Sequence, residues 1–273
     1  MKHGGAVTAP PILIYQMGKV GSTSLWETLT RSGIPNPVYK VHYLSDHGIR
    51  EGGAVFTHLL GVPGTLPHSD AVREVRELLT DEPDRPWKVV SVVRDPIARD
   101  VSSFVQLVHF AHPELTRPTI QEDKIARAAS LQFAMYSESD SYHSRWFDTE
   151  IRDMFGIDVF ETPFDHEHRR LRVSRGNVDL MVLRLEDLTA TLSGNLSWFL
   201  GVPPSDIPAV YASSRHPEKQ APAYDPDVYR RIVKRVRVPL ARSRPIYESR
   251  FARHFYTDDE IGRFAAGWAE GRD

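Results

Sequence analysis

The residues best suited to chemistry lie in one glycine-containing segment near the N-terminus. This segment consists of Gly18, Lys19, Val20, Gly21, Ser22, Thr23 and Ser24. It follows a short apolar run, 12–15, and precedes apolar residues at helical spacing. Glycines let backbone N–H groups converge on an anion, a helix N-terminus adds positive potential, and lysine and hydroxyl groups add donors. We therefore expect a phosphate-binding loop at 18–24; a tight turn that caps the helix is the alternative.

The position of the lysine distinguishes this loop from that of an ordinary ATPase. A Walker A loop carries its lysine directly after the last glycine. Here Lys19 precedes Gly21, and a serine follows that glycine. The loop is therefore typical of phosphate binding but not of the common ATPases.

A second candidate anion site follows the clearest predicted strand, 88–93. Arg94 ends that strand, Pro96 suits the first turn of a helix, and Ser102 comes eight residues after the arginine. Because the guanidinium fork matches phosphate oxygens, Arg94 and Ser102 could hold one phosphate together. A surface Arg94 that pairs with Asp95 is the alternative.

The elements that must position these residues alternate between short β-rich runs and longer helical runs. This pattern predicts an α/β fold with a central, mainly parallel β-sheet flanked by helices. Ligands of such sheets bind beyond the carboxyl ends of the strands. Residues 45–68 lack periodicity and contain several glycines, so we expect a long loop there that acts as a lid or acceptor loop. Strands are expected at 12–15, 38–41, 88–93 and 179–183, and helices after residue 24, at 72–79, from 96, and at 125–136, 144–155 and 188–200.

Length and composition limit the classes of protein. The 273 residues, 41% of them hydrophobic, suit one domain at 1–273 with a flexible N-terminus at 1–10. The formal net charge of −2 gives no indication of nucleic-acid binding, and the absence of cysteine excludes disulfides and thiolate sites. We find no signal-peptide core and no apolar run of about 20 residues. We expect a soluble, cytoplasmic protein, and the sequence leaves its oligomeric state open.

Taken together, these motifs resemble those of the sulfotransferases that use phosphoadenosine phosphosulfate (PAPS), a superfamily with a P-loop NTPase-like fold. Residues 19–23 match the superfamily's 5′-phosphosulfate loop, and Arg94 and Ser102 match its 3′-phosphate site. Residues 182–202 are similar to its strand, Glu-Asp-Leu turn and Phe-Leu-Gly helix end. Three motifs in order are much more specific than any one of them.

A closer resemblance is to a bacterial, sulfotransferase-like group named for capsular polysaccharide synthesis. It is carried by the stretches 14–22, 146–150 and 254–257. The resemblance implies polysaccharide biosynthesis as the setting and leaves the acceptor open.

The resemblance also implies the chemistry: a sulfonyl group passes from PAPS to a hydroxyl acceptor, a carbohydrate or other small metabolite, leaving adenosine 3′,5′-bisphosphate and requiring no metal. Lys19 would stabilise the charge that builds on the leaving phosphate. His42, which follows the predicted strand 38–41, is the expected general base, because its ordinary pKa of about 6.5 suits proton abstraction near neutral pH. A structural histidine at a strand end is the alternative. Lys40 and His109 are further candidates.

One part of the resemblance is incomplete. The cytosolic small-molecule enzymes have a late glycine-rich motif that grips the 3′-phosphate, and this chain has no counterpart. Arg215 lies in the matching region and could serve instead, or it could be a solvated loop arginine. Aromatic residues at 142–147 and a basic run at 230–237 could contact a glycan, although we expect the first to be core and the second to be a solvated face.

Two other functions stay open at this point. A P-loop kinase of a small metabolite would need ATP, Mg²⁺ and a lysine after the last glycine, which is absent. A non-catalytic sulfotransferase-like protein in polysaccharide assembly would not need the intact set of Lys19, Arg94 and Ser102.

Overall fold

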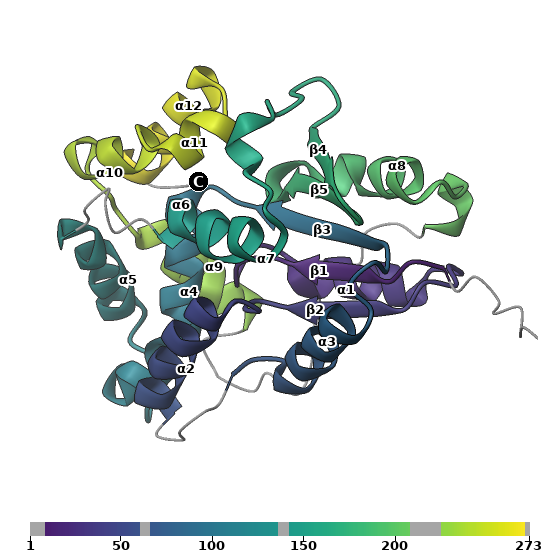
Figure 1. Ribbon diagram of the computed structural model, residues 1–273. Helices are drawn as coiled ribbons and strands as arrows, with labels where there is room; N and C mark the ends of the chain where they lie inside the picture. The colour runs from purple at the N-terminus through teal and green to yellow at the C-terminus, as the bar shows by residue number, and fades with distance from the viewer. Residues whose placement is uncertain (1–8, 61–65, 136–141, 208–224, 271–273) are drawn as a thin grey trace, which may run out of the picture.

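The fold is built on a five-stranded sheet with helices on both of its faces (Figure 1). The computed structural model describes residues 9–60, 66–135, 142–207 and 225–270. The strand order is β2-β1-β3-β5-β4; β4 pairs antiparallel with β5, and the other pairs are parallel. The strands are β1 (Ile12–Tyr15), β2 (Val38–Val41), β3 (Trp87–Val93), β4 (Arg170–Arg175) and β5 (Val178–Arg184). The expected α/β class with a mainly parallel central sheet is confirmed.

The helices fill the connections between strands and form a C-terminal group. A π-helical turn, η4, joins α6 and α7 into one helical segment. The α-helices are α1 (Ser22–Arg31), α2 (Asp46–Leu60), α3 (Ser69–Asp81), α4 (Pro96–Ala111), α5 (Glu122–Leu131), α6 (Tyr142–Trp146), α7 (Asp153–Phe155), α8 (Leu188–Leu200), α9 (Pro226–Arg235), α10 (Leu240–Tyr247), α11 (Arg250–Phe255) and α12 (Asp258–Glu270). The short helical turns are η1 (Pro113–Leu115), η2 (Gln132–Met135), η4 (Phe147–Arg152), η5 (Val159–Glu161), η6 (Leu185–Asp187) and η7 (Pro204–Asp206).

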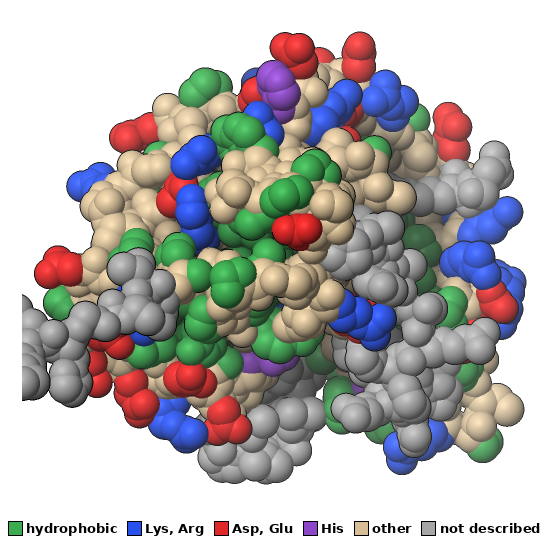
Figure 2. Space-filling model, turned by 90° about the vertical axis from the view of Figure 1, so that its right-hand side faces the viewer, with side chains coloured by type: hydrophobic (Ala, Val, Ile, Leu, Met, Phe, Trp, Pro, Cys, Tyr) green, Lys and Arg blue, Asp and Glu red, His purple; other side chains and the backbone are tan. Residues whose placement is uncertain are grey.

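The central strands are mostly apolar because helices cover both sides of the sheet. On one face, Lys40 extends over the Trp26 ring of α1 and Lys88 over the Phe199 ring of α8. The opposite face lies under α3 and the segment from α6 to α7 (Figure 1). A second hydrophobic cluster joins α4 and α5 to α9, α10 and α12. On the face shown in Figure 2, acidic and basic side chains lie interspersed, in keeping with the small net charge.

The chain leaves β1 and β3 in opposite directions. From β1 it passes through α1 to β2 at one edge of the sheet, whereas from β3 it eventually reaches β5 on the other side. The carboxyl ends of two adjacent parallel strands with diverging exits form the crevice where open α/β sheets bind ligands. The segments 16–21 and 94–95 therefore meet at this crevice. In the part of the chain that the structure describes, no helix is long and apolar enough to cross a membrane.

The expectation of a long loop at 45–68 is wrong, because α2 occupies Asp46–Leu60. Two of its three glycines, Gly48 and Gly52, serve close packing rather than a turn. A Cβ atom on Gly48 would lie 1.5 Å from Glu150 Oε1, and one on Gly52 would lie 2.9 Å from the Tyr43 ring. Glycine removes this conflict and lets α2 pack against these side chains. Residues 61–65 lie outside the described part of the chain.

The other expected helices and strands are present, with shifts of a few residues at their ends, and the motifs considered above gave no indication of β4 or of α9 to α12. Residues 144–155 are helical, as predicted, within a longer segment that begins at Tyr142. The expected helix at 125–136 is α5 followed by the turn η2, with residue 136 outside the described range.

A buried carboxylate joins the C-terminal helices to the β3–α4 junction. Asp95 caps α4 by accepting a hydrogen bond from Ile97 N at 3.1 Å. The same carboxylate accepts hydrogen bonds from Tyr247 Oη and Trp268 Nε1, each at 2.9 Å. Asp95 and Trp268 are each 1% exposed, so these donors are shielded from bulk water. Asp95 therefore links α10 and α12 to the end of β3.

We predict that Asp95→Asn lowers the free energy of unfolding by about 2–3 kcal/mol. The amide would present N–H groups to at least one buried donor, and an unsatisfied buried polar group costs about 1–3 kcal/mol. Urea denaturation followed by far-UV circular dichroism measures the change, with the exposed Asp84→Asn as the matched control. Equal stability of the two variants would contradict this role of Asp95.

Candidate functional site

The loop between β1 and α1 has the backbone conformation of an anion-binding turn. Lys19 and Gly21 both adopt left-handed conformations, with φ of 72° and 93°. Gly21 is the N-cap of α1, and no acidic residue lies in the first turn of this helix; the N-terminus of an α-helix presents N–H groups that the helix itself does not pair. Alternating left-handed residues turn successive N–H groups into a concave nest. The expected loop at 18–24 therefore has the predicted strand–loop–helix geometry.

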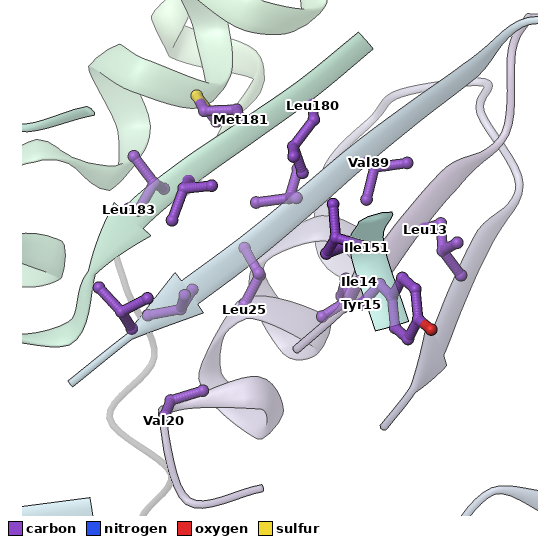
Figure 3. Close-up of a cluster of buried hydrophobic side chains, with 14 of the residues drawn as sticks. Leu13, Ile14, Tyr15, Val20, Leu25, Val89, Ile151, Leu180, Met181 and Leu183 are labelled. Carbon is purple, nitrogen blue, oxygen red and sulfur yellow. The ribbon is translucent and has the colours of Figure 1, made fainter. Parts of the chain in front are cut away.

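Two apolar side chains anchor the loop in the core. Val20 and Leu25 are fully buried and lie beside the β3 and β5 core residues in Figure 3. A Cβ atom on Gly21 would lie 2.7 Å from Leu185 Cδ1, and its φ of 93° is strained for any other residue. The sequence Val-Gly thus fixes the loop against the sheet while leaving its polar atoms at the crevice.

Arg94 lies against this loop. Its Nη1 donates a hydrogen bond to the carbonyl oxygen of Lys19 at 3.1 Å. Ser102 is buried in the second turn of α4, and within the described ranges no hydrogen bond joins its side chain to Arg94. The structure therefore brings Arg94 to the phosphate loop and leaves the shared grip of Arg94 and Ser102 on a phosphate a prediction. Arg215 lies outside the described residues.

A second arginine at the loop was missed by sequence reasoning. Arg99 Nε donates a hydrogen bond to the carbonyl oxygen of Gly18 at 3.2 Å. Its position in the first turn of the helix that follows Arg94 was the one available signal. Two cations therefore hold two consecutive carbonyl groups of the loop.

His42 lies at the end of β2 beside the start of the loop. Its Nδ1 lies 2.7 Å from the carbonyl oxygen of Gln16, which can only accept, so Nδ1 carries the proton and Nε2 carries the lone pair when the ring is neutral. Burial, together with the nearby charges of His68, Lys40 and Arg99, lowers the pKa of His42 to about 4, against the opposing effect of the Gln16 hydrogen bond. His42 is therefore neutral at physiological pH.

The side chain of Gln16 is fully buried at the same strand end. Among the described residues, neither its Nε2 nor its Oε1 has a hydrogen-bond partner. Its backbone carbonyl holds His42, and its neighbours 17 and 18 lead into the loop. A buried amide without partners is costly; Gln16 lies in the stretch 14–22 noted in the sequence, but no role was predicted for its side chain.

The remaining candidates lie away from the crevice or in the core. His109 is in the last turn of α4, ten residues or about 15 Å along the helix from Arg99. Trp146 and Phe147 are buried, as expected for core aromatics. In the basic run at 230–237, two arginines pair with Glu122 of α5, so part of this run holds α9 to α5.

Comparison with protein-family models, with curated proteins and with solved structures found no significant match to this chain. Among the described residues, no group of three or more His, Asp or Glu side chains could hold a metal ion. The geometry of the crevice is therefore the basis for assigning a function.

We predict that Lys19→Gly is more stable than Lys19→Ala by about 1 kcal/mol. Both variants lose the ammonium group, but only glycine adopts the left-handed conformation without strain, which costs other residues about 1–2 kcal/mol. Urea denaturation of the two proteins measures the difference. Both variants should bind pyrophosphate more weakly than the wild type does. A Lys19→Ala protein as stable as Lys19→Gly would show that the backbone relaxes at this position.

Proposed function

We propose that this chain is a PAPS-dependent sulfotransferase with the sulfotransferase variant of the P-loop fold, acting on a hydroxyl of a carbohydrate or other small metabolite. The observation that supports this most is the convergence of the two predicted anion elements at the crevice between β1 and β3. Arg94, which directly follows β3, donates to the carbonyl oxygen of Lys19 in the loop that follows β1. A donor with phosphates at both its 5′ and 3′ positions requires two such elements.

The residues present fit a donor of this kind. The backbone N–H groups of the loop and the hydroxyls of Ser22, Thr23 and Ser24 would hold the 5′-phosphosulfate at the N-terminus of α1. Arg94 has a planar fork suited to a phosphate, and we propose Ser102 and Arg215 as its partners at the 3′-phosphate. When bound, the donor supplies an activated sulfonyl group.

Lys19 and His42 carry the two charge-handling roles in this proposal. Lys19 would stabilise the negative charge on the departing phosphate, and one fixed donor of this kind is worth about 3–4 kcal/mol in a transition state. His42 would accept the proton of the acceptor hydroxyl at Nε2, because Nδ1 already donates to Gln16 O. The lowered pKa keeps this nitrogen unprotonated.

We predict that the protein binds adenosine 3′,5′-bisphosphate in the presence of EDTA and that Lys19→Ala weakens this binding at least tenfold. Isothermal titration calorimetry measures the affinity, and transfer of labelled sulfonate from PAPS to a panel of sugars measures activity. Arg73→Ala, a substitution of an exposed arginine on α3, is the matched loss of one positive charge. Tight binding of Mg-ATP together with no binding of the bisphosphate would favour a kinase and overturn the proposal.

We predict that kcat/KM stays level as the pH falls through 6.5 and declines only near pH 4. A general base must be unprotonated, and the lowered pKa of His42 moves its protonation to about pH 4. His42→Ala should lose turnover and retain binding of adenosine 3′,5′-bisphosphate. A wild-type profile that halves near pH 6.5, or an active His42→Ala protein, would assign the base to another residue.

A further inference from the structure

The two arginines at the loop hold consecutive peptide groups in one orientation. Arg99 Nε donates to Gly18 O at 3.2 Å, and Arg94 Nη1 donates to Lys19 O at 3.1 Å. In a trans peptide the C=O and the following N–H point in opposite directions. The N–H groups of Lys19 and Val20 therefore point away from the two guanidinium groups. A flip of either peptide would break a hydrogen bond to a cation.

Arg99 is itself held by two further contacts. Its Nη1 donates to Asp100 Oδ1 at 2.8 Å, and its Cζ lies 4.4 Å from the ring centroid of Tyr142. The Tyr142 hydroxyl is in turn 3.3 Å from the hydroxyl of Tyr43 at the end of β2. The side chain of Arg99 is only 13% exposed, so these contacts rather than solvent fix the direction of its guanidinium group.

The carboxylate beside Arg99 has a second basic neighbour. His143 Nε2, on α6, lies 3.3 Å from Asp100 Oδ1, and the His143 side chain is 1% exposed. Burial acts to raise the pKa of Asp100, but His143 and Arg99 outweigh it and lower the pKa to about 2. Asp100 is therefore a charged acceptor that connects α6 to the first turn of α4.

We propose that Arg99 is a positioning residue that, with Arg94, locks the phosphate loop with its N–H groups turned toward the bound anion, and that Asp100 and His143 hold Arg99 in place. Arg99 acts through the backbone of the loop. The identity of the anion rests on the proposed function, whereas the orientation of the peptides does not.

The first experiment measures how well the loop's N–H groups are protected by an anion. Backbone amide hydrogen exchange at residues 18–22 is measured in the wild type and in Arg99→Met, each with and without saturating pyrophosphate. The slowing of exchange at Lys19 and Val20 by pyrophosphate should be at least tenfold smaller in the variant, because rotated peptides no longer turn these N–H groups toward the anion. Arg73→Met, which removes an exposed arginine paired with Asp70 on α3, should leave this slowing unchanged. Equal slowing in Arg99→Met and in the wild type would overturn the inference.

The second experiment measures anion binding. Arg99→Met should bind pyrophosphate at least tenfold more weakly, and Arg99→Lys should recover part of this loss, because lysine can donate to Gly18 O or to Asp100 but has no planar fork for both. Arg99→Met leaves the negative charge of Asp100 without its arginine partner and could therefore fail to fold. In that case the double variant Arg99→Met/Asp100→Asn, which also removes the carboxylate charge, is used instead. Wild-type affinity in the folded variant would overturn the inference.

The two proposals fail in different ways. If the wild-type protein binds pyrophosphate but not adenosine 3′,5′-bisphosphate, the proposed sulfotransferase function is wrong. The exchange measurement would still decide the role of Arg99. Protein that binds both ligands with the same affinity before and after the Arg99 substitution would overturn the positioning role alone.

Discussion

The parallel pairing of β1 between β2 and β3 is the constraint on which the site depends. Parallel strands end at the same edge of the sheet, so the residues that follow three strands meet there whatever their separation along the chain. His42 follows β2, Gln16 and the phosphate loop follow β1, and Arg94 follows β3. Because the chain leaves β1 and β3 in opposite directions, these residues lie at the point of the sheet where open α/β folds bind their ligands.

Buried carboxylates then fix the flanking helices to this edge. Glu150 accepts hydrogen bonds from the backbone N–H groups of Leu44 and Ser45 and from the hydroxyl groups of Ser45 and Tyr15. Burial raises the pKa of Glu150, and these four donors oppose that effect. These bonds tie the π-helical turn that carries Glu150 to the ends of β1 and β2. Leu44, one of the donors, is two residues after His42. Asp95 makes the equivalent link between β3 and the C-terminal helices.

The unit at 12–31 was predictable from the sequence because its determinants are local: a short apolar run, glycines at the turn and apolar residues at helical spacing. The helix α2 was not predictable, because Gly48 suggests a loop when the sequence is considered alone. Its role depends on Glu150, more than 100 positions later, which occupies the space that a side chain at position 48 would need. The same holds for Arg99 and Gln16. No role was predicted for either residue, although Gln16 lies in the stretch 14–22, and only the tertiary contacts around the loop identify them.

Three unfavourable features gather at the carboxyl ends of β1 and β2. Lys19 is held in a left-handed conformation, and Gln16 buries an amide that has no partner among the described residues. The pKa of His42 is lowered by burial. Glycine at position 19 and an apolar residue at position 16 would remove two of these costs. Among the described residues, buried polar side-chain atoms without a hydrogen-bond partner also occur at Thr28, Trp87 and Ser91, but each of these side chains has one such atom, whereas Gln16 has both a donor and an acceptor. Strain that the surrounding fold maintains is typical of ligand sites, and it supports the role proposed for this end of the sheet.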